Sequence, residues 1–230
     1  MKLKKISRKA ESVKRLYEKM RKELDEDREE KFLTNLTIIT NRGFHEELSW
    51  SEVEEKVLDY FYGENLKSNE QGIFEEIFST ISKYFKDAHN IKLDPRKINF
   101  KDLLYSKDGI DFEDRIHLHI EKCKNGIYTL ENMIHVYDKI LKTETSCLFH
   151  GLQHAAFDDE EFVVCEFIGG CDKCTNEFND GEIYRWDECA EGSGPPYHPN
   201  CGCGFIDWIA EEDERRDLFP EYFPDNEDDF

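Results

Sequence analysis

The sequence predicts an α+β protein, with a mainly helical body and a small cysteine-rich β-hairpin module near the C-terminus. Apolar residues recur at helical spacing through the first two thirds of the chain, whereas short β-branched and aromatic runs begin at about residue 158. Six of the eight cysteines lie between residues 165 and 203. We therefore expect a helical body over residues 1–157, a β module over 158–208 and an acidic, aromatic tail over 209–230.

The N-terminal helix is expected over about residues 8–33, because apolar residues recur there three or four positions apart. They are Val13, Leu16, Tyr17, Met20 and Leu24. Residues 1–22 hold ten Lys/Arg against two Glu and so carry +8, which leaves −29 for the remaining 208 residues. Such an acidic surface repels nucleic acid, so DNA contact is expected only through this basic segment, whose alternative interpretation is a solvated helix face.

Further helices are indicated in the body, among them a short segment that Asp94-Pro95 opens and a helix from Asp111 to about Gly126. Ser51–Glu54 fits a capping box, and the helix that it begins has Gly63 as its natural stop. Residues 70–88 carry the strongest apolar stripe of the chain, and another stripe predicts a helix from Leu130 to about residue 157.

Two strands are expected after the composition changes. Residues 162–168 have the β-branched and aromatic content of a strand, and so do residues 182–186. Between them Asn179-Asp180-Gly181 is a hairpin-turn signal. The module is therefore predicted to contain a β-hairpin.

Two short cysteine segments flank the second strand of this hairpin. In the first segment, Cys171-x-x-Cys174, both sulfurs can face one tetrahedral ion, and the second, His198-x-x-Cys201-x-Cys203, can supply the other two ligands. We rank Cys171, Cys174 and His198 first, then Cys203 and Cys201 as near equals. The spacing predicts one structural Zn²⁺, which makes this a zinc-stapled β-hairpin module; disulfides or packed thiols are the alternatives.

A structural role for the zinc is favoured over a catalytic one, because the chain itself can fill all four positions. His45-Glu46 provides the first half of a deaminase signature, but it lies in the helical region far from the cysteines. His150 and His154, at i and i+4, are interpreted as helix-surface or packing residues. The remaining cysteines are expected to be small buried side chains: Cys123, Cys147, Cys165 and Cys189.

Six segments in the order of the chain resemble the bacteriophage head-morphogenesis (minor head protein) family. They are Lys142-Thr143-Glu144-Thr145, Phe149 to Ala156, Phe162 to Ile168, Cys171-Asp172-Lys173-Cys174, Asp180 to Tyr184 and Pro196-Tyr197-His198-Pro199-Asn200-Cys201-Gly202-Cys203. Together they span about residues 130–206. Lys142 replaces the Arg of the family's Arg-Thr-Glu-Thr helix, and Gly202 replaces the Arg of its closing H-P-N-C-R-C.

The resemblance implies a virion or capsid-assembly component, present in few copies and associated with the portal or the inner head. Its partners would be portal or capsid proteins, in the host cytoplasm during assembly and then in the virion. No apolar run approaches the roughly 20 residues that span a bilayer, and the basic N-terminus has no apolar stretch behind it. We therefore expect a soluble protein without a signal peptide or a membrane partner.

Two other classes of function remain open from the residues alone. A zinc-stabilised regulatory or host-takeover protein would bind a host factor through the acidic surface and the Phe-rich tail. A metal-dependent hydrolase is the third class, although no general acid or base is apparent beside the cysteines. Within the Thr-Glu-Thr run, Glu144 is interpreted as a helix residue that contacts the zinc module, and a catalytic carboxylate is the less favoured alternative. We expect binding and assembly rather than catalysis.

Overall fold

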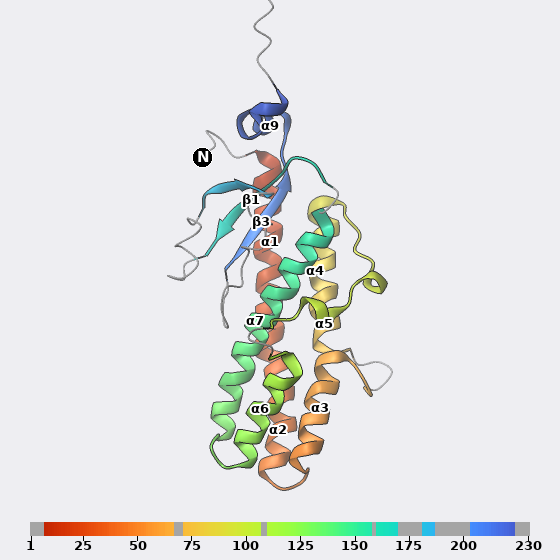
Figure 1. Ribbon diagram of the computed structural model, residues 1–230, viewed down its shortest axis with the longest axis vertical. Coiled ribbons are helices and arrows are strands. Elements are labelled where there is room, and N and C mark those ends of the chain that lie inside the picture. Colours follow the sequence, from red (N-terminus) through yellow and green to blue (C-terminus); the bar gives the residue numbers. More distant parts are fainter. Residues whose placement is uncertain are drawn as a thin grey trace, which may run out of the picture.

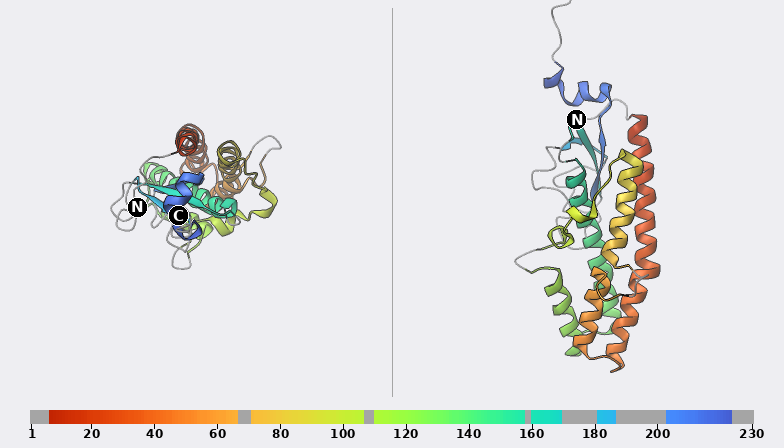
Figure 2. Two further views of the ribbon diagram at one scale, coloured as in Figure 1. Left: turned by 90° about the horizontal axis from the view of Figure 1, so that it is seen from above. Right: turned by 90° about the vertical axis from the view of Figure 1, so that its right-hand side faces the viewer.

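The computed structural model describes residues 7–66, 71–106, 110–157, 160–169, 181–186 and 203–223. Helices run along the long axis of the molecule, and a small sheet lies with the C-terminal elements toward one end (Figure 1). Seen from the side, the helices stand next to one another as a bundle (Figure 2). The predicted α+β class with a mainly helical body is confirmed for these residues. None of their helices combines the length and apolar character that crossing a membrane requires.

The first helix is longer than predicted. α1 (Arg8–Asp27) continues through a π-helical turn, Arg28–Phe32, into α2 (Leu33–Phe44). The predicted apolar stripe is buried in α1, and the burial of Phe32 and Leu36 continues that face beyond residue 33. The buried face therefore extends beyond the predicted end of the helix, and the helical path ends at Phe44.

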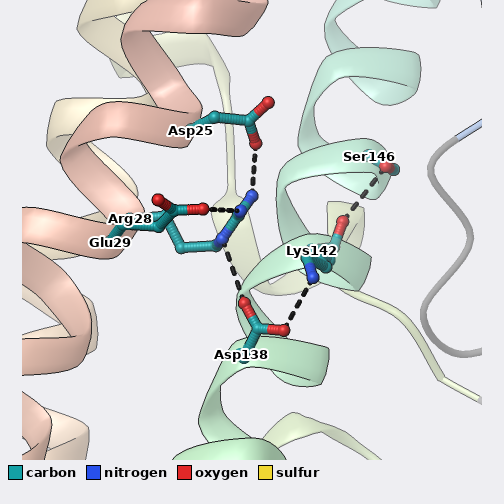
Figure 3. A network of polar contacts seen from close by, with 6 residues as sticks. All are labelled: Asp25, Arg28, Glu29, Asp138, Lys142 and Ser146. Atoms are coloured by element: carbon teal, nitrogen blue, oxygen red, sulfur yellow. Dashed lines mark hydrogen bonds and ion pairs between the residues drawn. The ribbon is translucent and has the colours of Figure 1, made fainter.

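The π-helical turn presents Arg28 to carboxylates of two helices (Figure 3). Its guanidinium pairs with Asp25 and with Glu29 on its own helical path, and its Nε lies 3.1 Å from Oδ1 of Asp138. Asp138 also accepts a hydrogen bond from Lys142 Nζ at 2.7 Å. Because Asp138 and Lys142 belong to the long helix α7 (Leu130–Phe157), this network joins the first helix to α7.

The next two helices bear out most of the prediction. α3 (Trp50–Tyr62) ends at Gly63, whose φ of 79° is left-handed, and α4 (Ile73–His89) carries the strong apolar stripe on its buried face. The capping box lies at Ser49 and Glu52, however, so the expected start at Ser51 is wrong by two residues. The earlier start brings Trp50 into the helix, where its ring packs edge-on against Phe44 at 5.0 Å.

The last helices of the body include the one that faces the sheet. Two short elements, η2 (Pro95–Lys97) and α5 (Phe100–Leu103), lead to α6 (Phe112–Lys124). Asp111 caps α6 by accepting a hydrogen bond from Asp114 N at 2.8 Å. α7 spans the predicted helix to Phe157 and contacts α2, α4 and the sheet.

The sheet has three antiparallel strands in the order β2-β1-β3. β1 (Val163–Ile168) and β2 (Ile183–Arg185) match the predicted hairpin strands. β3 (Gly204–Ile209) was not predicted; it begins directly after the predicted metal-binding segment, which ends at Cys203. Its side chains Phe205, Ile206 and Trp208 are buried, and it contacts both α1 and α7. β3 therefore attaches the sheet to the helical body.

The segment expected to be a tail is folded as far as residue 223. It contains α9 (Glu212–Leu218) and a short 3-10 turn, Pro220–Tyr222. Phe219 is buried, and its ring packs against Phe162 at 5.3 Å. Buried apolar side chains from Ala10 to Phe219 form one continuous cluster, while the division of the chain into three segments stays a prediction.

Candidate metal centre

Cys203 is the one predicted zinc ligand that lies within the described residues. The other four, Cys171, Cys174, His198 and Cys201, lie outside them. Cys203 is buried and immediately precedes β3. Across the described ranges, no group of three or more His, Cys, Asp or Glu side chains is arranged to hold a metal ion. The ligand set therefore stays a prediction. What the structure describes is the positions of the residues that lead into and out of the two cysteine segments.

The register of β1 against β3 places the chain before the first cysteine segment beside the last residue of the second. Ile168, the last residue of β1, pairs with Gly204, the first residue of β3. Beyond that pair, Gly169 lies against Cys203: a methyl group on Gly169 would lie 2.5 Å from Cys203 Sγ and 2.7 Å from Phe167 Cζ. A side chain at position 169 would therefore require Cys203 or Phe167 to move. The first cysteine segment begins at Cys171, two residues after Gly169. The backbone of Gly169 lies against the Cys203 thiol.

The return strand of the hairpin starts at the same end of the sheet. Gly181 N donates a hydrogen bond to Phe167 O at 2.9 Å, and Phe167 N donates one to Glu182 O at 3.1 Å. Gly181 has a φ of 75°, which agrees with the predicted turn signal at its position. Three chain positions that lead into or out of the cysteine segments, 169, 181 and 203, therefore gather at one end of the sheet.

A buried polar cluster lies on the helix side of β3 and was missed by sequence reasoning. Gln153 of α7 donates hydrogen bonds to Phe205 O at 2.8 Å and to Asp207 Oδ2. Asp207 is 1% exposed, and burial raises its pKa well above the ordinary value. The pKa values of Tyr17 and Tyr84 are raised too, first by burial and also by Asp207. An aspartate in a strand is usually exposed, so its sequence gives no sign of this role.

We expect Asp207→Asn to stabilise the protein, by an amount that grows with pH. Because burial raises the pKa of Asp207, the folded chain holds a proton that the unfolded chain releases above about pH 4. Stability is therefore lost as pH rises, by up to about 1.4 kcal/mol per pH unit, until the folded carboxyl itself ionises. The asparagine side chain does not titrate, so the variant does not undergo this loss of stability as the pH rises.

Urea unfolding of both proteins at about pH 6.5 and about pH 8 checks this prediction. Asp217→Asn, on the exposed surface of α9, is the matched control and should track the wild type. A difference in unfolding free energy between Asp207→Asn and wild type that does not change with pH would contradict a protonated buried Asp207.

Glu144 is a buried residue of the helical body. Its Oε1 lies 2.5 Å from Nη2 of Arg115 on α6, and its Oε2 accepts a hydrogen bond from Tyr105 N at 2.9 Å. Burial raises the pKa of Glu144, whereas Arg115 and the Tyr105 N–H oppose this shift. Among the described residues, the hydrogen bonds of Glu144 go to α6 and to the segment before it, and its contact with the zinc module stays a prediction.

The other thiols and histidines are placed mostly as expected. Cys123, Cys147 and Cys165 are buried, while Cys189 lies outside the described residues. Burial raises the pKa of the Cys123 thiol to about 11. His150 and His154 form a close pair beside Trp186.

The chain was compared with protein families, curated proteins and solved structures. No family model, no curated protein and no solved structure matches it.

Proposed function

We propose that this chain is a bacteriophage minor head or capsid-morphogenesis protein that acts through protein–protein contacts at the portal or the inner head. One structural Zn²⁺ would be held by Cys171, Cys174, His198 and either Cys203 or Cys201. One observation carries the proposal. The pairing of Ile168 with Gly204 places the chain that leads to the first cysteine segment beside the end of the second, at one end of the sheet. A single ion between those segments would close the hairpin loop onto the start of β3.

The zinc in this proposal stabilises the fold and does not turn over a substrate. Four protein ligands leave no open position for water, which is the arrangement typical of a structural zinc site. The helical segment that carries the family resemblance, α7, packs on β3 through Gln153. The resembling segments that the structure describes lie in α7, β1 and β2, and these elements are joined through contacts of β3 with α7 and of β1 with β2 and β3.

The alternative, a host-takeover protein that binds through a Phe-rich tail, receives less support. Phe219 of that segment is buried, and the Arg185 guanidinium lies 4.7 Å from its ring centroid. The Phe219 ring therefore packs within the chain, whereas Tyr222 of the same segment is 61% exposed. DNA contact through the basic N-terminal segment remains part of the proposal, although Lys14 of that segment already pairs with Glu166.

Purified phage particles test the proposed role directly. We expect the chain in mature particles or in assembly intermediates from infected or induced cells, in few copies relative to the major capsid protein. Mass spectrometry of gradient-purified material measures this. Absence from both fractions, with recovery of the chain on a host protein, would contradict the head-assembly role and favour the alternative.

A further inference from the structure

The two histidines on the last turns of α7 converge on one point. His150 Nε2 lies 3.1 Å from His154 Nε2, and the two rings are nearly perpendicular, at 85°. Two nitrogens that are each about 2.0–2.1 Å from one metal ion, and about 100° apart around it, lie about 3.1 Å from each other. The separation thus fits both a hydrogen bond between neutral imidazoles and a pair of ligands on one ion.

The protonation state of the pair suits metal binding. Burial, followed by the neighbouring His154, lowers the pKa of His150 to about 4. His150 is therefore neutral at physiological pH, which is the form in which imidazole binds a metal. Binding through both Nε2 atoms requires each ring to carry its proton on Nδ1, so the ion replaces the hydrogen bond without a net release of protons.

An aromatic wall covers the pair on one side. The ring centroid of Trp186 lies 5.0 Å from that of His154 and 6.3 Å from that of His150. Trp186 follows Arg185, which pairs with Val164 near the start of β1. Cys203 precedes Gly204, which pairs with Ile168 at the end of β1. The histidines therefore contact the end of the sheet opposite to Cys203.

We propose that His150 and His154 form a second metal site, which takes one divalent transition ion such as Zn²⁺ through both Nε2 atoms. Imidazole ligands favour ions of the Zn²⁺ class over Mg²⁺ and Ca²⁺, which prefer oxygen. No third His, Cys, Asp or Glu among the described residues completes the site. With two imidazole ligands among the described residues, we expect this ion to be held more weakly than one with four protein ligands. The proposal does not depend on the zinc at the cysteine segments.

Zinc titration of the full-length chain, already carrying its tightly bound metal, tests this proposal. Calorimetry is expected to detect one further Zn²⁺ per chain. Since removing a partner of a metal ligand lowers affinity by about 10–100-fold, His150→Gln or His154→Gln is expected to weaken this equivalent by at least about tenfold. His135→Gln, an exposed residue on the same helix, is the matched control and should leave binding unchanged.

Imidazole NMR of the wild-type protein provides a readout that does not depend on whether the variants fold. Added Zn²⁺ is expected to shift the ring resonances of His150 and His154 and to leave those of His135 in place. The proposal is overturned if no further equivalent binds, if it binds equally well in both glutamine variants, or if the two imidazoles do not respond. Loss of the tight equivalent alone, in variants of the cysteines, would count against the structural zinc and not against this pair.

Discussion

Glu144→Ala is expected to lower the free energy of unfolding by about 3–5 kcal/mol, because it leaves the Arg115 guanidinium without its buried partner. The side chain of Glu144 is fully buried, and Arg115 is 16% exposed at its side chain, so water can replace little of the lost interaction. Tyr105 N also loses its acceptor. Chemical denaturation of the purified variant measures the loss.

Two variants show whether the charge or the acceptor matters. Glu144→Gln keeps an oxygen for the Tyr105 N–H and removes the charge, so we expect an intermediate loss of stability. Glu131→Ala, in the exposed first turn of the same helix, is expected to change stability by no more than about 1 kcal/mol. A stable Glu144→Ala protein would contradict the structural role and reopen a functional one for this carboxylate.

Replacing both Cys171 and Cys174 by serine is expected to remove the tightly bound zinc and to unfold the sheet while the helical body persists. Binding of a structural zinc contributes on the order of 10–16 kcal/mol in small zinc domains. Without the ion, the hairpin loop and β3 would no longer be stabilised by this binding energy. Hydrogen exchange should accelerate at β1 and β3 and stay slow in α4, whose apolar face packs in the helical core.

Cys123→Ser is the matched control for that experiment. Cys123 is buried in α6, where burial raises the pKa of its thiol to about 11, and it is not among the predicted ligands. We expect a modest loss of global stability and an unchanged zinc content. Equal zinc content in the paired serine variant and the wild type would contradict the assignment of the first cysteine segment.

Much of the fold could be predicted because its signals are local. The apolar stripe of α4, the stop at Gly63 and the β-branched run of β1 depend on neighbours within a few residues. The continuation of the first helix could not be predicted, since its buried face crosses the π-helical turn at Phe32. The capping box was misplaced because Ser49 and Ser51 are each followed by a glutamate three positions later.

The candidate site could be predicted only in its residue types. The cysteine spacing indicates a metal, but the register that brings Gly169 to Cys203 depends on β3, whose Gly-rich start resembles a loop. The partners of the buried charges are distant in the chain: Glu144 meets Arg115, and Asp207 meets Gln153. The two histidines were recognised as an i, i+4 pair, but the convergence of their Nε2 atoms depends on their side-chain conformations.

The zinc content of the purified, reduced chain, measured before and after treatment with a strong chelator, tests the central claim most directly. After dialysis that removes weakly held ions, we predict one zinc per chain, and we predict that the chelator removes it and exposes the amides of β1 and β3 to exchange. A chain that contains no metal, and whose sheet keeps its protection in the chelator, would contradict a structural zinc between the two cysteine segments.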